Sequence, residues 1–357
     1  MNYKNVFLKW YEDCFKSSEM YIAMTDTVED SPYHREANVA THTDMVVCEY
    51  IKLSPYTWSK KDFLGAVVCA MHDVGKPLSE EVVERSDGTK YRRYSNHELW
   101  SQRIYMEYIL SCDGSELREY LDDSDIYNIG YMIQYHLPYQ LGKDRTAWLQ
   151  THLSHYGIVD IFIRCISADA MGRISDDTEA TLLRLTTWVN DNLLLLDYHR
   201  HNTIHTDKEL VVMVGVTGVG KSTYVEAQFP SHKVHSMDAL RLEWYSSDYN
   251  QAFKLSCDDN EFSTKVMKDF RNTISNNDKV VVDNTNLKVK DRRRFITNTK
   301  HRTKAVVLLT TYQKNLSQLL VRKDKHIGKF VLDRMFWNLT LPSLGEFDDI
   351  VIVVSPD

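Results

Sequence analysis

The chain has 357 residues, of which 43% are hydrophobic and 26% charged, and its net charge is −7. These values predict a globular protein of two domains. With no signal peptide and no apolar run long enough to span a bilayer, a membrane protein is disfavoured and a cytoplasmic one is expected.

The cysteines indicate the cellular compartment, and the charges indicate which ligands each half of the chain suits. The six cysteines show no paired spacing, which indicates buried thiols in a reducing compartment and argues against a disulfide or zinc framework. The first 200 residues hold 20 Lys and Arg against 31 Asp and Glu, whereas the rest hold 23 against 19. The acidic half suits bound cations and the basic half suits a phosphate backbone.

Residues 1–200 have a helical pattern. Segments 61–71, 97–110 and 178–196 carry apolar residues at three- and four-residue spacing. No convincing period-two strand is found, and Gly and Pro are sparse. We therefore predict an all-α domain in residues 1–200, with short loops between its helices.

Histidines and aspartates in this half form an ordered set of possible metal ligands. His72 and Asp73 lie together at the end of an apolar helix, where they offer one nitrogen and one oxygen ligand, and the carboxylate can also bridge two metals. Four further residues complete the ordered set: His42, His97, His136 and Asp169. Any one of these histidines could equally be a core or surface residue, so the prediction depends on the set.

This order, with the sequences HDVGK and ADAMGR, resembles the HD-domain metal-dependent phosphohydrolase superfamily over roughly residues 34–175. The resemblance implies a first divalent transition metal held by His42, His72, Asp73 and Asp169. A second metal would be held by His97 and His136. Such metals make hydroxide available near neutral pH for attack on a phosphoester.

Several other residues of this half have more than one interpretation. Lys76 and Arg173 are candidates for holding the substrate phosphate, and His34 is expected near the same opening. His152 and His155 are interpreted as core or surface residues. The two acidic neighbours of the predicted ligands are interpreted as solvated or as orienting a ligand histidine: Asp44 and Glu98.

The segment 197–209 is polar and contains His199, His201 and His205. These histidines could bind a metal, but a polar linker is the favoured interpretation. We place the domain boundary here.

Residues 207–357 alternate predicted strands with helices. The strand candidates are 210–214, 233–236, 279–283, 304–310 and 349–354. Helical crossovers between strands predict an α/β domain with a parallel sheet and helices on both faces. Sites in such domains gather at the carboxyl ends of the strands.

The first of these strands runs into a complete G-x-x-x-x-G-K-[ST] loop. Its glycines let backbone N–H groups face a polyphosphate, Lys221 reaches the β- and γ-phosphates, and Ser222 takes a place on Mg²⁺. The predicted site for ATP, or another NTP, with Mg²⁺ consists of Gly215, Thr217, Gly218, Val219, Gly220, Lys221, Ser222 and Thr223.

Three more clusters follow predicted strands or helices. Asp238 and Arg241 suit a base that takes a proton from an incoming hydroxyl and an arginine that steadies the acceptor. A surface carboxylate near a helix N-terminus is the alternative. Asp283 could serve Mg²⁺ through water or the acceptor side. Arg322 lies in a basic segment that suits a lid over the triphosphate.

The order GxxxxGKS, DxxR, DNTN and VR resembles the polynucleotide 5′-kinase family from about residue 210 to 341. The resemblance implies that Asp238 is the general base, Arg241 contacts the acceptor, Asp283 lies on the acceptor side and Arg322 is a lid arginine. It also gives Lys221 and Ser222 their roles toward phosphate and Mg²⁺. Where the family has a second lid arginine, this chain has His326, between Lys325 and Lys329.

Two features near the acceptor motifs have two interpretations each. The basic run 288–304 is either a solvated face or a path for nucleic acid. Trp244 and Tyr245 either stack a terminal base or pack in the core.

Together the two halves resemble the HD-domain–polynucleotide kinase end-healing enzymes of bacteria and phages. The resemblance implies phosphorylation of 5′-OH ends and removal of 2′,3′-cyclic, 2′- or 3′-phosphates from RNA or DNA ends, together with a separate ligase. Two alternatives stay open: a nucleoside or nucleotide kinase fused to an HD nucleotidase, and a regulated HD hydrolase whose P-loop only senses ATP.

Overall fold

The computed structural model describes residues 1–29, 35–84, 86–175, 177–194, 206–322, 325 and 327–355. The chain forms two compact units, Met1–His199 and Arg200–Asp357. Within the described part, no helix has the length and apolar character needed to cross a bilayer.

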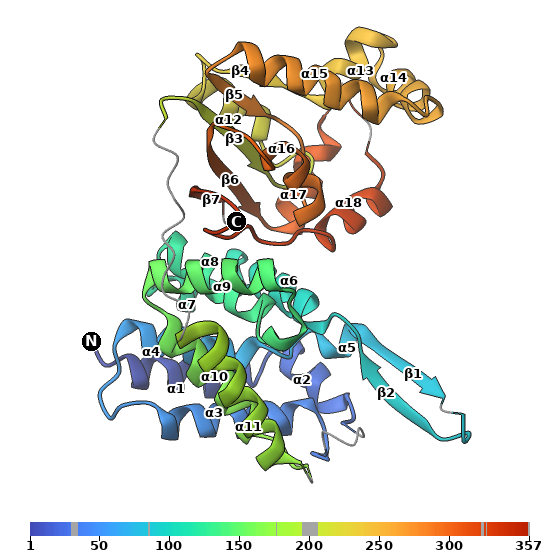
Figure 1. The fold of residues 1–357 in the computed structure, drawn as a ribbon. Coiled ribbons are helices and arrows are strands. Elements are labelled where there is room, and N and C mark those ends of the chain that lie inside the picture. Colours follow the sequence, from blue (N-terminus) through green and yellow to red (C-terminus); the bar gives the residue numbers. More distant parts are fainter. Residues whose placement is uncertain are drawn as a thin grey trace. The chain divides into compact units, whose positions relative to one another are not determined.

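The first unit is built mainly of helices (Figure 1). Its α-helices are α1 Tyr3–Trp10, α2 Glu19–Asp26, α3 Val39–Leu53, α4 Lys60–Met71, α5 Lys76–Ser79, α6 His97–Leu110, α7 Ser115–Arg118, α8 Asp123–Gln134, α9 Lys143–Tyr156, α10 Val159–Met171 and α11 Thr178–Val189. Short π- and 3₁₀-turns are η1 Tyr11–Phe15, η2 Cys112–Gly114, η3 Pro138–Gln140 and η4 Asn190–Leu194.

Helix α4 is the centre of this unit. A capping box starts it: Ser59 accepts from the backbone N–H of Asp62, and the Asp62 carboxylate accepts from the N–H of Ser59. Every residue from Asp62 to Met71 is buried, and α3, α8 and α10 pack around the helix. Such all-round burial matches the nearly continuous apolar sequence. The helices predicted at 61–71 and 97–110 are confirmed as α4 and α6.

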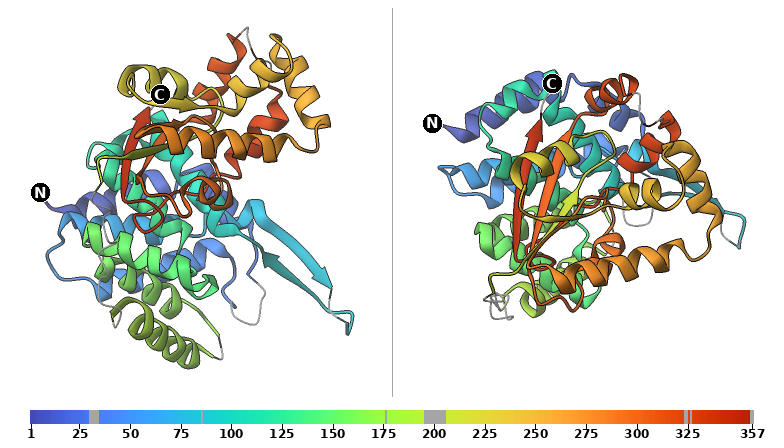
Figure 2. Two further views of the ribbon diagram at one scale, coloured as in Figure 1. Left: turned by 45° about the horizontal axis from the view of Figure 1, so that its top comes forward. Right: turned by 90° about the horizontal axis from the view of Figure 1, so that it is seen from above.

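A β-hairpin in this unit contradicts the expectation of no strands. Strands β1 Glu80–Glu84 and β2 Lys90–Tyr94 pair antiparallel, and they extend away from the helices in Figures 1 and 2. The sequence shows no alternation of apolar and polar residues here, because the hairpin buries few side chains. Ion pairs such as Arg92–Glu80, at 2.9 Å, link its two strands instead. The sequence Asp87-Gly88, which favours the tight turn of a β-hairpin, is the feature from which the hairpin could have been predicted.

The second unit has a five-stranded sheet with the order β4-β5-β3-β6-β7, and every pairing is parallel. Its strands are β3 Glu209–Val214, β4 Lys233–His235, β5 Lys279–Val282, β6 Arg302–Thr310 and β7 Asp349–Ser355. Its helices are α12 Lys221–Gln228, α13 Met237–Trp244, α14 Tyr249–Asp258, α15 Phe262–Asn276, α16 Val289–Ile296, α17 Tyr312–Leu320 and α18 Lys329–Phe336.

The strand predictions are confirmed, with ends that differ by one or two residues. The central strand β3 is buried from Leu210 to Val214 because it has a neighbour on each side, β5 and β6. Side chains from β3, β5, β6 and α12 form one core cluster, which contains Val211, Met213, Val225, Val281, Val306 and Leu308. This core fixes the edge of the sheet from which the loops of the site project.

The basic run 288–304 does not belong entirely to the surface. Arg292 is fully buried and forms a two-pronged ion pair with Glu346, at 2.7 and 2.9 Å. It also donates to the backbone carbonyls of Leu287, at 3.0 Å, and Thr340, at 2.9 Å. Arg292 therefore ties α16 to the chain before β7 and takes no part in a path for nucleic acid.

Glu346→Gln is expected to destabilise this unit by about 3–5 kcal/mol, because it leaves a buried guanidinium without its counter-charge. The measurement is hydrogen-exchange mass spectrometry of peptides from β6 and α16 in increasing urea. Arg293→Gln, at an exposed neighbour, should stay within about 0.5 kcal/mol of wild type. Equal stability of both variants would contradict a structural role for the pair.

The thiols are free, but they are not uniformly buried as expected. Cys69 and Cys165 are buried, whereas Cys48, Cys112 and Cys257 are exposed. The spacing pattern excluded paired cysteines but carried no information about exposure, which depends on which face of each helix a cysteine occupies.

Candidate functional sites

The six predicted metal ligands lie together inside the first unit. They come from five helices or their ends: α3, α4, α6, α8 and α10. They are all buried, with at most 9% of each residue exposed: His42, His72, Asp73, His97, His136 and Asp169. Because these helices pack on one another around α4, residues up to 127 positions apart meet in one cluster.

Asp73 is shared between two groups of histidines. Its Oδ2 lies 3.5 Å from His42 Nε2 and 3.2 Å from His72 Nε2. Its Oδ1 lies 3.2 Å from His97 Nε2 and 3.8 Å from His136 Nε2. The ligand atoms of each group lie within 4.8 Å of one another. This geometry suits one cation on each side of a bridging carboxylate.

Asp169 completes the first group, with its Oδ1 3.2 Å from His42 Nε2 and 3.9 Å from His72 Nε2. The first group thus offers two imidazole nitrogens and two carboxylate oxygens. That mixture suits transition metals such as those of the Irving–Williams series better than Ca²⁺ or Mg²⁺, which prefer oxygen alone.

Backbone carbonyls fix the orientation of the four histidines. Each Nδ1 lies near a carbonyl oxygen, with partners and distances as follows: Gly172 for His42 at 3.1 Å, Cys69 for His72 at 2.8 Å, Tyr94 for His97 at 2.8 Å and Ile133 for His136 at 2.8 Å. A carbonyl can only accept, so Nδ1 carries the proton and a neutral imidazole turns its Nε2 lone pair inward. Metal-binding histidines commonly donate this other ring N–H to a carbonyl or a carboxylate, which orients the ring toward the metal.

The spacing of His97 and His136 also indicates a metal site. Their Nε2 atoms lie 3.2 Å apart. In neutral rings whose Nδ1 atoms carry the protons, two lone pairs face each other at this distance, which is unfavourable. A cation held between them and Asp73 removes the repulsion, so these residues fit a metal.

The charges of the cluster also favour a cation. Burial raises the pKa of the Asp73 carboxyl, but His72 and Lys76 outweigh it and hold that pKa well below its usual range. Burial and the neighbouring His97 lower the pKa of His136 to about 3, which keeps the ring neutral. Anionic carboxylates and neutral imidazoles are the forms that bind metals. Burial lowers the pKa of His42, but Asp169 and Glu36 outweigh it and raise that pKa to about 9, so this ring would lose a proton when a metal binds.

Lys76 and Arg173 contact the carboxylates of the cluster. The Lys76 ammonium is buried, 2.8 Å from Asp73 Oδ2 and 2.5 Å from Glu29 Oε1. Arg173 donates to Asp169 Oδ2 at 2.7 Å. Their action on a substrate phosphate stays a prediction. His34 and the histidines at 199, 201 and 205 lie outside the described residues.

Gly75 lets the His72-Asp73 turn approach α6. A Cβ at this position would lie 2.4 Å from the Ser101 nitrogen and 2.5 Å from the His97 carbonyl oxygen. The close approach brings the bridging carboxylate to His97, so the glycine is part of the geometry of the cluster.

Residues interpreted as outside the cluster have other partners. His152 is buried against Tyr131, with ring centroids 3.9 Å apart, and His155 is exposed. Asp44 accepts hydroxyl hydrogens from Tyr11 at 2.7 Å and Tyr21 at 3.0 Å. Glu98 is half-buried on α6.

In the second unit, the loop between β3 and α12 has the backbone of a phosphate-binding loop. Gly218 and Gly220 have φ values of 81° and 94°, which favour glycine. A Cβ on Gly218 would also lie 2.7 Å from Leu319 Cδ2. Asn315 on α17, which is fully buried, donates to the Thr217 carbonyl at 3.0 Å. The loop is thus braced by α17.

The loop meets the residues that follow β4 and β5, because β4, β5 and β3 are neighbours in the sheet. Ser222 donates to Asp283 Oδ2 at 2.7 Å. Asn284 accepts from the N–H of Met237 at 2.9 Å and so joins the ends of β5 and β4. Of the two roles open for Asp283, its position beside Ser222 favours the one toward Mg²⁺.

Asp283→Asn is expected to raise the Mg²⁺ concentration needed for half-maximal nucleotide turnover by about 10- to 100-fold, as loss of an outer-shell carboxylate does in other metal sites. A Mg²⁺ titration at fixed ATP measures it. The control is Asp278→Asn, which removes a carboxylate at the opposite end of β5. Among the described ion pairs, the Asp278 carboxylate pairs only with Lys208. This variant should leave the Mg²⁺ titration unchanged. If the titration were unchanged for both variants, the role of Asp283 toward Mg²⁺ would be wrong and its role on the acceptor side would be preferred.

Asp238 and its three contacts, Arg241, Tyr249 and Lys325, form the predicted acceptor cluster. Asp238 Oδ1 accepts from Arg241 Nη1 at 2.7 Å and from the Tyr249 hydroxyl at 3.0 Å. Asp238 Oδ2 contacts the Lys325 ammonium. Burial raises the pKa of the Asp238 carboxyl, but Lys325 and Arg241 outweigh it and lower that pKa. The carboxylate is therefore ionised, which is the form that a general base requires.

Positive charge converges on the same place. Burial lowers the pKa of Lys221 to about 8, and the charges of Lys325 and Arg322 add to this effect, although Asp283 and Asp238 oppose it. Lys221 donates to loop carbonyls, including Val216 at 2.7 Å. Cations that repel one another at a phosphate-binding loop form a site for a polyanion. His326 lies outside the described residues.

Sequence reasoning missed several residues of these sites. Glu29 and Glu36, near Lys76 and His42, follow no motif. Tyr249 acts through a contact between α14 and α13, and Asn315 through a contact between α17 and the loop. Only Lys325 had a signal, as a basic residue in the lid segment. Trp244 is exposed, whereas Tyr245 donates to Asp259 and packs on Phe262.

The comparisons with known proteins bear on the second unit. The AAA domain family matches residues 210–341, a span that begins in β3 and ends before β7. No curated protein matches the chain. With the parallel sheet and the phosphate-binding loop, the match indicates a nucleotide-binding domain of the P-loop kinase type, and hence a kinase-type enzyme that uses a nucleotide with Mg²⁺.

Proposed function

We propose that the protein is a bifunctional end-healing enzyme for nucleic acid, with RNA as the expected substrate. The second unit transfers the γ-phosphate of ATP to a 5′-OH end. The first unit is an HD-type phosphohydrolase that removes a 2′,3′-cyclic, 2′- or 3′-phosphate with one or two divalent transition metals. A separate ligase would seal the products.

One observation supports the kinase activity above the others. An ionised carboxylate, Asp238, lies at the same sheet edge as the phosphate-binding loop, with Arg241 and Lys325 on its two oxygens. Phosphoryl transfer requires alignment, charge neutralisation and one group that orients the attacking hydroxyl. A nucleotide sensor needs no such base, so the arrangement argues against the P-loop as a mere ATP sensor.

The phosphohydrolase activity is supported by the shared carboxylate of Asp73. One metal would be held by Asp73 Oδ2 together with His42, His72 and Asp169. A second would be held by Asp73 Oδ1 together with His97 and His136. Bound there, the metals supply an activated water near neutral pH and Lewis acidity toward a phosphoester. The chain itself fixes the ligands through backbone carbonyls and places Arg173 beside Asp169.

The test is one synthetic RNA with a 5′-OH and a 2′,3′-cyclic phosphate, incubated with ATP, Mg²⁺ and a transition metal while both ends are followed. Lys221→Ala should lose only 5′ phosphorylation, Asp73→Ala only 3′-end processing, and the double variant both.

If the wild type modifies neither end, the polynucleotide assignment is wrong. Phosphorylation of free nucleoside in preference to oligonucleotide would instead support a nucleoside or nucleotide kinase fused to a nucleotidase. If both variants lose both activities, two independent sites are excluded.

A further inference from the structure

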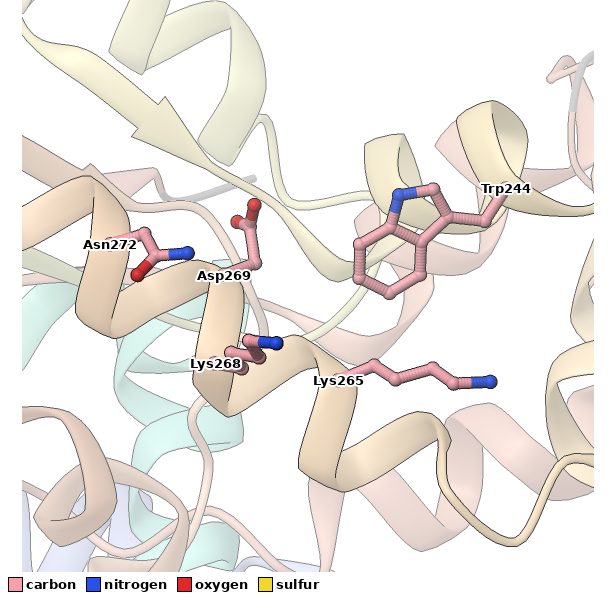
Figure 3. Close-up of a pocket in the computed structure, with 5 residues that line it drawn as sticks. All are labelled: Trp244, Lys265, Lys268, Asp269 and Asn272. Atoms are coloured by element: carbon pink, nitrogen blue, oxygen red, sulfur yellow. The ribbon is translucent and has the colours of Figure 1, made fainter.

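A pocket lies next to the acceptor cluster, between α13 and α15. It is lined by Trp244, the last residue of α13, and by four residues of α15: Lys265, Lys268, Asp269 and Asn272 (Figure 3). Trp244 is 37% exposed, so part of its indole ring is open to a ligand. The indole reaches toward the polar side chains of α15 in Figure 3.

A series of side-chain contacts links Asp238 to the pocket, beginning with the hydrogen bond from Arg241 to Asp238 at 2.7 Å. The Arg241 guanidinium lies 5.0 Å from the centre of the Phe262 ring, and the Trp244 ring meets the same ring edge-on at 6.2 Å. Trp244 lies six positions after Asp238 on α13, which is about 9 Å along the helix axis. A stacked strand advances about 3.4 Å per nucleotide, so the pocket lies two to three nucleotides from the predicted general base, Asp238.

The charges around the pocket divide into satisfied and available groups. Lys265 pairs with Asp259 at 2.8 Å. Asp269 lies 3.0 Å from His235 Nδ1, but it keeps its negative charge because burial lowers the pKa of His235 and leaves that ring neutral. Lys268 is exposed and forms no ion pair within the described part of the chain. An exposed aromatic plane beside an available ammonium is the combination that binds single-stranded nucleic acid, with the base on the ring and the phosphate on the cation.

We infer that this pocket is a subsite for an internal nucleotide of the acceptor strand, two or three positions from the 5′-OH. Its base stacks on Trp244 and its phosphate contacts Lys268, without sequence preference. The inference rests on the proposed kinase function and extends it: the preferred acceptor is a strand of several nucleotides, and a mononucleotide cannot reach the subsite.

The test compares a short single-stranded RNA with a nucleoside 3′-monophosphate as acceptors for the full-length protein. Trp244→Leu should raise KM for the RNA by about 5- to 100-fold and leave the mononucleotide unaffected. Trp244→Phe, which keeps a stacking plane, should lie closer to wild type. Lys268→Ala should weaken RNA use and reduce its salt dependence, whereas Lys279→Ala, at the far end of β5, should not.

Binding of a fluorescent RNA, followed by anisotropy without ATP, separates this inference from the proposed function. If the wild type phosphorylates no acceptor but Trp244→Leu still weakens RNA binding, the kinase assignment fails and the subsite stands. If RNA binding and KM are the same in wild type, Trp244→Leu and Lys268→Ala, the subsite is refuted. Equal losses for RNA and mononucleotide would also refute it, because they indicate general damage to α13.

Discussion

Asp238→Asn should slow phosphate transfer to a 5′-hydroxyl by about 10²- to 10⁴-fold, because the amide keeps the shape of the side chain but cannot take the proton. It also leaves the guanidinium of Arg241 and the ammonium of Lys325 without their shared carboxylate. Nucleotide affinity should change little, since Asp238 contacts neither the glycines of the loop nor Ser222 among the described hydrogen bonds.

The measurement pairs single-turnover transfer from ATP with ATP binding by calorimetry. Glu243→Gln makes the same chemical change at an exposed position of α13 and should leave both quantities at the wild-type level. Full transfer activity in Asp238→Asn would mean that the base lies elsewhere.

Asp73→Ala should empty both sides of the metal cluster, because each carboxylate oxygen faces a different histidine group. Processing of the 3′ end should fall to about a hundredth of the wild-type rate or less. His136→Ala should remove only the metal of the second group, since the first group keeps His42, His72 and both carboxylates.

Metal content per chain, measured by mass spectrometry after dialysis, checks this order: two in wild type, one in His136→Ala and none in Asp73→Ala. Asp44→Asn serves as the control, because this carboxylate lies on the same helix as His42 but binds two tyrosine hydroxyls. One metal remaining in Asp73→Ala would show that the carboxylate is not shared.

The parts that the sequence predicted well have local causes. Strands β3 and β5 are buried on both faces, so they read as apolar runs bounded by polar residues, and the loop from Gly215 to Ser222 has a spacing set by phosphate geometry. The helices α4 and α6 follow from periodicity alone. In each case neighbouring residues determine the outcome, so nothing about the rest of the chain is needed.

What could not be predicted depends on contacts between distant segments. The pairing of Arg292 with Glu346 joins residues 54 positions apart, and nothing in a run of basic residues marks one of them as buried. The position of Asp283 beside Ser222 depends on β5 lying next to β3. The carbonyls that orient the histidines have no side-chain signature, so only the fold reveals them.

The hairpin β1–β2 offers a practical attachment point. In the sequence it lies between His72-Asp73 and His97, and the carbonyl of Tyr94 at its base holds His97. Its turn, however, lies about four residues, or roughly 13 Å, farther out. Ser86 in this turn is exposed and can carry a label, whereas Gly88 has a φ of 81°, at which a side chain would be strained. A fluorophore or a surface tether placed at this turn should therefore leave the cluster intact, which makes the hairpin a natural handle for single-molecule work on the enzyme.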